Sequence, residues 1–441
     1  MSDEVKDPAT PTRVVIVGGG FGGFFTALGL ERATRRGGPP LDVTLIHDGN
    51  ALVYTPFLPQ AAGGTLEPRH VVVPLRGPLR ETHILVGKAT EHDGEARTIH
   101  YVSEAGDERT IPYDHLVAAP GSVSRTLPIP GLRESAVGFK TVAEAIHLRN
   151  RAIKALEVAN SADDPAERAA RLTFVFVGGG YAGVEALAEL EDMMREAKNL
   201  YPDLAGERLR FVLVEATDSI FPEVGARLSS YAMRELDRRG VEMRLGTTIT
   251  DATGGGVTLS TGERIECRTL VWTAGVRTHP TMGLLGLPTD RRGRAVVDAT
   301  LAVEGRENVW ALGDSAAVPD PARIGLPCPP TSQHAVRQAR VVARNILATI
   351  TGGEVTRFSY RTRGTFVDLG RGKAVANVLG LQFRGVPAWF LARTYHLSQI
   401  PGITRKGRVA VDWTIALLFR RDVAELGTLG HPPPLEPPAA P

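Results

Sequence analysis

The clearest indication of chemistry in this sequence is the spacing of the glycines in two glycine-rich loops. The first reads V-G-G-G-F-G-G, and its glycines are Gly18, Gly20 and Gly23. The second reads V-G-G-G-Y-A-G-V-E, and its glycines are Gly178, Gly180 and Gly183. In this spacing the first glycine permits a tight turn, the second lets the backbone approach a pyrophosphate, and the third lets a helix pack closely on a strand. Each loop therefore predicts a site for the diphosphate of a dinucleotide.

The segments around both loops have the same predicted order of elements. A run of buried strand residues precedes each loop, at Arg13–Val17 and Leu172–Val177. A helix follows each loop, at Phe24–Arg35 and Val184–Lys198, and a second strand comes next, at Asp42–Ile46 and Leu209–Glu215. The chain thus holds two βαβ units about 160 residues apart. We expect an α/β fold with two Rossmann-like dinucleotide-binding domains.

The acid at the end of the second strand differs between the two units. In the second unit it is Glu215, which is expected to bind the adenosine ribose hydroxyls and to repel a 2′-phosphate, so that NADH is preferred over NADPH. In the first unit His47 occupies the expected position and the acid, Asp48, follows it. A neutral imidazole can hydrogen-bond a ribose hydroxyl, but a histidine on the surface fits this pattern equally well. Two loops imply two nucleotides, and the simplest pairing is FAD in the first and nicotinamide in the second.

A later segment supports FAD. Residues 308–316 read N-V-W-A-L-G-D-S-A, which is a strand that ends at a Gly-Asp turn. The carboxylate of Asp314 would bind the ribityl or phosphate region of the flavin from that position.

Composition excludes several other classes of protein. The 441 residues carry 51 basic and 49 acidic side chains, a balance that argues against nucleic-acid binding. The two cysteines, Cys267 and Cys328, cannot form a disulfide scaffold or a four-cysteine zinc site, and no metal site is predicted. They also lack the spacing of a redox dithiol, so we interpret both as structural.

Taken together, these motifs resemble the two-dinucleotide-binding flavoproteins, and within them the type II NADH dehydrogenases, which are single-chain NADH:quinone oxidoreductases. The resemblance covers roughly residues 12–427. Besides the two loops it rests on V-W-T-A-G-V at 271–276, V-W-A-L-G-D at 309–314, S-Q-H-A-V-R-Q at 332–338, G-K-A-V-A at 372–376 and the segment from Y-H-L-S at 395 to W-T-I-A-L-L-F-R-R-D ending at 422. It implies oxidation of NADH through FAD and reduction of a membrane quinone of the menaquinone or ubiquinone type, without proton pumping.

The resemblance also implies roles for individual residues. FAD would lie along Gly18, Gly20, Gly23, His47, Asp48, Pro56, Gly121 and Asp314. NADH would lie along Gly178, Gly180, Gly183, Glu215 and Gly275. Three side chains would serve the reaction: Glu185 near the nicotinamide, Gln333 at a quinone carbonyl, and Lys373 near the flavin and the quinone.

Departures from the family pattern cluster around the expected acceptor pocket. Ser332 and Arg337 stand where the quinone motif A-Q-x-A-x-Q has Ala and its second Gln, while Gln338 follows one place later. Two other enzyme or protein classes therefore stay open. One is a FAD/NADH oxidoreductase that reduces a soluble protein or a small molecule. The other is a flavin-bearing structural or signalling protein that oxidises NADH slowly.

The segment 386–422 has a composition of its own. Tryptophans and large apolar residues alternate with basic residues there, and seven Arg or Lys lie between Arg384 and Arg421. This pattern predicts a pair of amphipathic helices on an anionic membrane surface. Packing against the same chain or a dimer partner is the alternative. Together with the resemblance, the composition of this segment implies a peripheral protein on the cytoplasmic side of the cell membrane. The resemblance also implies a homodimer.

We expect four segments along the chain. Residues 12–157 and 286–350 form the two parts of the FAD-binding domain, 165–285 the NADH-binding domain, and 351–430 a C-terminal membrane-interface domain. The polar stretch 158–170 is expected to be a linker or surface loop.

Overall fold

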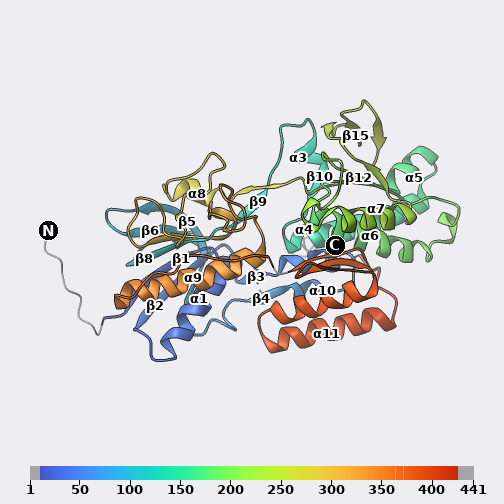
Figure 1. The fold of residues 1–441 in the computed structure, drawn as a ribbon. Helices are drawn as coiled ribbons and strands as arrows, with labels where there is room; N and C mark the ends of the chain where they lie inside the picture. The colour runs from blue at the N-terminus through green and yellow to red at the C-terminus, as the bar shows by residue number, and fades with distance from the viewer. Residues whose placement is uncertain (1–9, 363, 371, 426–441) are drawn as a thin grey trace, which may run out of the picture.

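The computed structural model describes residues 10–362, 364–370 and 372–425, and Figure 1 shows its arrangement. Its first large sheet has seven strands in the order β19-β8-β1-β2-β5-β6-β7. The strands are β1 Thr12–Val17, β2 Leu41–His47, β5 His83–Asp93, β6 Thr98–Ser103, β7 Glu108–Pro112, β8 His115–Ala118 and β19 Val309–Ala311. The pairs from β19 to β5 are parallel, whereas β5-β6 and β6-β7 are antiparallel.

The second large sheet has five parallel strands in the order β10-β17-β11-β12-β13. They are β10 Ala136–Gly138, β11 Thr173–Val177, β12 Arg210–Val214, β13 Glu242–Arg244 and β17 Thr269–Trp272. All five residues of β11 are buried, as expected for the centre of a parallel sheet that is covered on both faces. β10 lies within residues 12–157, which were predicted to belong to the FAD-binding domain, but it pairs with β17 of the predicted NADH-binding domain. The domain boundaries remain a prediction.

Helices cover these sheets as the two βαβ units require. The glycine loops open α1 Phe21–Thr34 and α6 Tyr181–Lys198, and α9 Ser332–Thr351 packs beside α1 (Figure 1). The other helices before the C-terminal segment are η1 Thr55–Phe57, α2 Leu58–Ala62, η2 Pro68–Val71, α3 Leu132–Ser135, α4 Val142–Ser161, α5 Pro165–Arg171, η3 Pro202–Leu204, η4 Pro222–Val224, α7 Ala226–Arg238, α8 Thr281–Leu284 and η5 Gly313–Ser315.

The prediction of a linker at 158–170 is wrong, because α4 and α5 occupy most of that stretch. Proline takes the first helical position of α5, where its missing N–H costs nothing, and the Asp164 side chain accepts a hydrogen bond from the amide of Ala166 at 2.9 Å. The polar residues therefore start a helix.

Small antiparallel sheets complete the part of the chain that the structure describes. Two of them have two strands each: β3 Ala51–Val53 pairs with β4 Val72–Pro74, and β9 Ser122–Ser124 pairs with β18 Val276–Thr278. A third has three strands in the order β14 Ile249–Asp251, β15 Gly256–Leu259 and β16 Arg264–Glu266. The last sheet contains β20 Gly364–Asp368, β21 Ala374–Val378 and β22 Leu381–Arg384.

The last two helices in the described part of the chain are α10 Val386–Gln399 and α11 Ile403–Leu418, which lie side by side (Figure 1). The break between them falls at Pro401-Gly402, and Gly402 has a positive φ of 85°. This confirms the predicted helix pair. Within the described residues no helix is both long enough and apolar enough to cross a bilayer.

Three aromatic and basic side chains of this segment do not face outward as its composition suggested. Trp413 is buried and donates to the Gln60 side chain at 2.7 Å, and Arg421 is buried 3.2 Å from the carboxylate of Glu189. Arg393 is buried as well, and its guanidinium lies 4.3 Å from the centre of the Trp389 ring on the same helix. Trp413 and Arg421 thus attach this segment to the rest of the chain, and none of the three is available to a membrane.

Candidate active site

The first glycine loop packs tightly against the protein at Gly18 and Gly23 but leaves space beside Gly20. A Cβ on Gly23 would overlap the carbonyl oxygen of Gly18, and a Cβ on Gly18 would overlap the carbonyl of Ala119. Beside Gly20, in contrast, a Cβ would have no neighbour within 4 Å among the described residues. The backbone at Gly20, at the amino end of α1, is therefore accessible to a diphosphate, whose charge the helix dipole would stabilise.

The second loop repeats this geometry. A Cβ on Gly183 would overlap the carbonyl oxygen of Gly178, and a Cβ on Gly178 would lie 2.7 Å from Oγ1 of Thr273. Beside Gly180 a Cβ would again meet nothing within 4 Å in the described part of the chain. The two loops thus offer two equivalent cradles for a dinucleotide.

His47 and Glu215 occupy corresponding places beside the loops. A Cβ on Gly19 would lie 2.7 Å from the His47 ring, and a Cβ on Gly179 would lie 2.9 Å from Cγ of Glu215. Burial lowers the pKa of His47, so its imidazole is neutral at neutral pH, and its Nδ1 lies 3.1 Å from a carboxylate oxygen of Asp48. The Glu215 carboxylate accepts from the amides of Gly179 at 2.5 Å and Thr217 at 2.8 Å. Each side chain lies beside its own glycine loop, and its contact with a ribose remains a prediction.

A double variant, Glu215→Ser with Ala216→Arg, is expected to move the preference from NADH toward NADPH. The change removes a carboxylate that repels the 2′-phosphate and adds a cation that attracts it. We expect the NADPH-to-NADH ratio of kcat/KM to rise by about 100-fold, which corresponds to ~3 kcal/mol. Asp218→Ser, at a nearby exposed acid, is the control. An unchanged ratio in the double variant would show that Glu215 does not hold the ribose.

Asp314 lies in a polar cluster where three segments of the chain meet. Its carboxylate accepts from the hydroxyl of Ser122 at 2.5 Å and lies 3.7 Å from Nζ of Lys140. Gly121 and Gly275, both with positive φ, immediately precede the paired strands β9 and β18, and an added Cβ at either would have no described neighbour within 4 Å. The contacts of Gly121 and Asp314 with the flavin and of Gly275 with NADH remain predictions.

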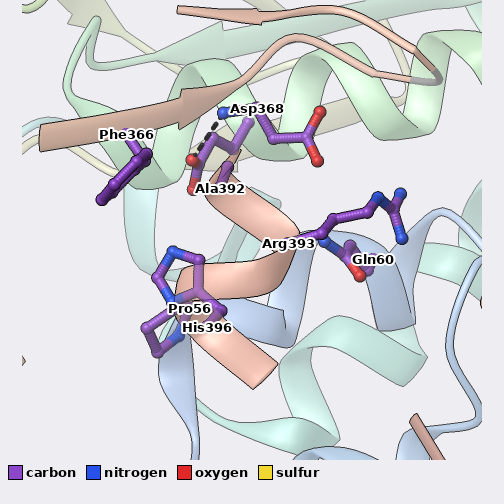
Figure 2. Close-up of a pocket in the computed structure, with 8 residues that line it drawn as sticks. Pro56, Gln60, Phe366, Asp368, Ala392, Arg393 and His396 are labelled. Carbon is purple, nitrogen blue, oxygen red and sulfur yellow. Dashed lines mark hydrogen bonds between the residues drawn. The ribbon is translucent and has the colours of Figure 1, made fainter. Parts of the chain in front are cut away.

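Two pockets share one histidine, His396 of α10. The first, the carboxylate pocket, is lined by Pro56, Gln60, Glu185, Phe366, Asp368, Ala392, Arg393 and His396. The second, the aromatic pocket, is lined by Phe21, Phe25, Tyr54, Ser332, Gln333, Val336, Arg337, Tyr395, His396 and Gln399. Glu185 follows the second glycine loop and Phe21 follows the first, so each pocket borders one of the two cradles. Figure 2 shows His396 next to Pro56, with Asp368 on the strand opposite.

The side chains of two acids, Glu185 and Asp368, line the carboxylate pocket. The amide of Asp368 donates to the Glu185 carboxylate at 2.9 Å, the bond that is dashed in Figure 2. Burial raises the pKa of Glu185 well above its usual range and raises that of Asp368 to about 8. Both groups therefore carry a proton at neutral pH. The sequence indicated no proton donor, and the structure supplies two.

Gln333 is held firmly at the wall of the aromatic pocket. Its Nε2 donates to the carbonyl of Gly364 at 3.1 Å, and its Oε1 accepts from the hydroxyl of Tyr360 at 2.9 Å. His396, which sequence reasoning missed, contacts the Tyr54 hydroxyl through Nδ1 at 3.2 Å. Burial lowers the pKa of His396 to about 4, so its ring is neutral.

Lys373 is paired with an acid outside the two pockets. Its ammonium pairs with the buried carboxylate of Glu235 on α7, and it is not among the residues that line either pocket. Its predicted role near the flavin and the quinone stays a prediction that this geometry does not favour. Asp368, five residues earlier, is the side chain of this segment that reaches the carboxylate pocket.

Both cysteines are free and buried. Burial raises the thiol pKa of Cys267 and of Cys328 to about 11 each, so neither forms a thiolate at neutral pH. Their interpretation as structural residues agrees with this.

Comparisons with known proteins give consistent results. The family model described as pyridine nucleotide-disulphide oxidoreductase matches residues 12–339. The type II NADH:quinone oxidoreductase Ndh of Mycobacterium tuberculosis is 32% identical over 96% of this chain and 92% of its own length. Demethylphylloquinone reductase NdbB of Synechocystis is 29% identical over 91% of this chain and 95% of its own.

A solved structure has the same fold. The NDH2 of Plasmodium falciparum in complex with NADH superimposes with a TM-score of 0.85 at 18% identity, and the match covers 94% of this chain and all of that one.

Proposed function

The chain belongs to the pyridine nucleotide-disulphide oxidoreductase family, and on this premise we propose how its own residues carry out the reaction. It is an NADH:quinone oxidoreductase with FAD as its cofactor. FAD supplies the chemistry that accepts hydride from one substrate and returns two electrons to the other. We assign the first loop to FAD, because β19, which leads to Asp314, lies in the same sheet as the strand before that loop. We assign the second loop to NADH, because Glu215 lies beside it and a carboxylate there disfavours the 2′-phosphate of NADPH.

The single observation that best supports this function is the pair of pockets that meet at His396. One pocket borders the loop assigned to NADH and contains two protonated carboxyl groups, while the other borders the loop assigned to FAD and is lined by aromatic rings and amides. A quinone needs both: an apolar place for its ring and a source of protons for its oxygens. The test records the visible absorbance of the flavin. We expect NADH to remove this absorbance and a quinone that is added afterwards to restore it.

Glu185 is proposed as the group that holds a proton for quinone reduction. Its burial keeps the carboxyl protonated, and the amide of Asp368 fixes one of its oxygens toward the pocket. Once it gives up that proton, the neighbouring carboxyl of Asp368 can supply the next one. The resemblance implied instead that Glu185 lies near the nicotinamide. A role at the nicotinamide would affect the reduction of the flavin by NADH, whereas a role as proton donor affects the reoxidation of the flavin by quinone.

The helix pair α10 and α11 is proposed as the surface that contacts the membrane. Its outward side exposes large apolar residues, namely Val386, Phe390, Ile403, Val411, Ile415, Leu417, Leu418 and Phe419. Exposed basic residues flank them, including Arg384, Arg408 and Arg420. Such a surface combines apolar burial with attraction to anionic lipid. A location on the cytoplasmic side, a homodimer, and a quinone of the menaquinone or ubiquinone type belong to the same proposal.

Replacing both Leu418 and Phe419 with serine is expected to weaken binding to anionic vesicles. These side chains are 73% and 64% exposed, so their loss removes apolar area from the membrane contact and leaves the core intact. We expect co-sedimentation to fall by at least about tenfold. Ile324→Ser is the matched control, because Ile324 is 98% exposed outside the helix pair. Unchanged vesicle binding with a reduced mass by light scattering would assign this surface to a dimer partner.

A further inference from the structure

Arg337 replaces a neutral amide of the quinone motif and brings a positive charge into the aromatic pocket. Its guanidinium carbon lies 4.1 Å from the centre of the Tyr360 ring, and its Nη1 donates to the carbonyl oxygen of Gln333 at 3.0 Å. These two contacts hold the planar group at the pocket wall. Arginine remains charged at every physiological pH, so the cation is permanent.

No carboxylate neutralises that charge from within the pocket. Among the ten described residues that line the aromatic pocket none is acidic. Burial raises the pKa of both Tyr54 and Tyr395, which keeps the two phenols neutral, and the ring of His396 is neutral as well. A cation surrounded by neutral aromatic and amide groups is set to attract negative charge on whatever occupies the pocket.

The residue predicted to bind the acceptor is already engaged elsewhere. Both ends of the Gln333 amide are hydrogen-bonded within the chain, to Gly364 and to Tyr360. The guanidinium of Arg337 carries five N–H donors, more than its hydrogen bonds to Gln333 and to the side chain of Tyr395 use. It is therefore the better-placed donor for an oxygen of the acceptor.

We propose that Arg337 determines acceptor specificity: its guanidinium binds a quinone carbonyl oxygen in the aromatic pocket and favours acceptors that carry or develop negative charge beside that oxygen. The inference rests on the proposed function. NADH supplies two electrons and one proton, a second proton comes from solvent by way of Glu185 and Asp368, and O–H bonds form at both quinone oxygens, giving NAD⁺ and quinol. Arg337 keeps its proton throughout and stabilises the oxygen before it is protonated.

The test compares two acceptors, neutral menadione and an anionic naphthoquinone sulfonate. The ratio of kcat/KM for the sulfonate to that for menadione is measured in the wild type, Arg337→Gln, Arg337→Lys and Arg340→Gln. We expect this ratio to fall about tenfold in Arg337→Gln, since a charge-assisted contact is lost, and to be largely kept in Arg337→Lys. Arg340→Gln, an exposed arginine of the same helix, should match the wild type. Reduction of the flavin by NADH should be unchanged in all four.

An equal ratio in Arg337→Gln and the wild type, with both quinones still reduced, would overturn the inference and leave the proposed function standing. Failure of every quinone with the wild-type enzyme would overturn the proposed function itself. If Arg337→Gln does not fold, the inference is tested instead by measuring how the ratio of kcat/KM for the sulfonate to that for menadione depends on salt in the wild type. A ratio that falls as ionic strength rises supports the role of the charge, and a ratio independent of salt contradicts it.

Discussion

Replacing Gly23 with alanine is expected to give protein that purifies without flavin. The added Cβ would overlap the carbonyl oxygen of Gly18, so helix α1 and strand β1 could no longer approach each other and the cradle at Gly20 would lose its shape. The measurement is the visible flavin absorbance per protein chain. Gly206→Ala is the control, because an added Cβ there has no described neighbour within 4 Å and its φ is not positive.

The same substitution in the second loop should have a different outcome. In Gly183→Ala the Cβ would overlap the carbonyl oxygen of Gly178, but the first loop is untouched. We therefore expect this variant to keep its flavin and to lose reduction by NADH, with a fall in kcat/KM for NADH of at least about 100-fold. If Gly183→Ala loses flavin and Gly23→Ala keeps it, the assignment of the two loops is reversed. Flavin in both variants with normal reduction by NADH would contradict the cradle geometry altogether.

Glu185→Gln is expected to slow the reoxidation of the flavin by quinone by about 100-fold, within the range that general acid catalysis contributes. Glutamine keeps the shape and polarity of the side chain but cannot release a proton. In the wild type the same step should slow as the pH rises, because the proton on Glu185 and Asp368 is needed and the pKa of Asp368 is about 8. The pH dependence near 8 should remain in the variant, because Asp368 is intact, while the rate is lower at every pH.

The control for Glu185→Gln is Glu104→Gln, at an exposed acid of the β6–β7 turn. Rapid mixing separates the two half-reactions. If reduction by NADH slows and reoxidation by quinone does not, Glu185 serves the nicotinamide, as its sequence position first suggested. If both rates are unchanged, neither role is correct.

Much of the fold could be predicted from local patterns. The strands and helices next to the two loops follow from β-branched runs, helix periodicity and glycine spacing, and β1, β2, β11 and β12 lie where they were expected. The placement of His47 opposite Gly19 could also be predicted, because the two units repeat one geometry. These features depend on neighbours in sequence, which is why the sequence reveals them.

Three of the pocket residues depend on contacts between distant segments and were missed for that reason. Asp368, Arg393 and His396 come from the C-terminal segment and meet Glu185 about 180 to 210 residues away in the chain. The same long-range packing buries Trp413 and Arg421, whose composition suggested a membrane contact. It also directs Lys373 to Glu235. Asp368 follows Phe366 and Val367 in the sequence, but no pattern there pairs it with Glu185.

The most direct test of the central claim follows one flavin through both half-reactions. Purified protein is placed under anaerobic conditions, one equivalent of NADH is added, and menadione or a short-chain ubiquinone follows. The account predicts that NADH removes the visible flavin absorbance, that the quinone restores it, and that one quinol forms for each NADH consumed. A flavin that NADH bleaches but that neither quinone restores, while a soluble protein or inorganic oxidant does, would contradict it.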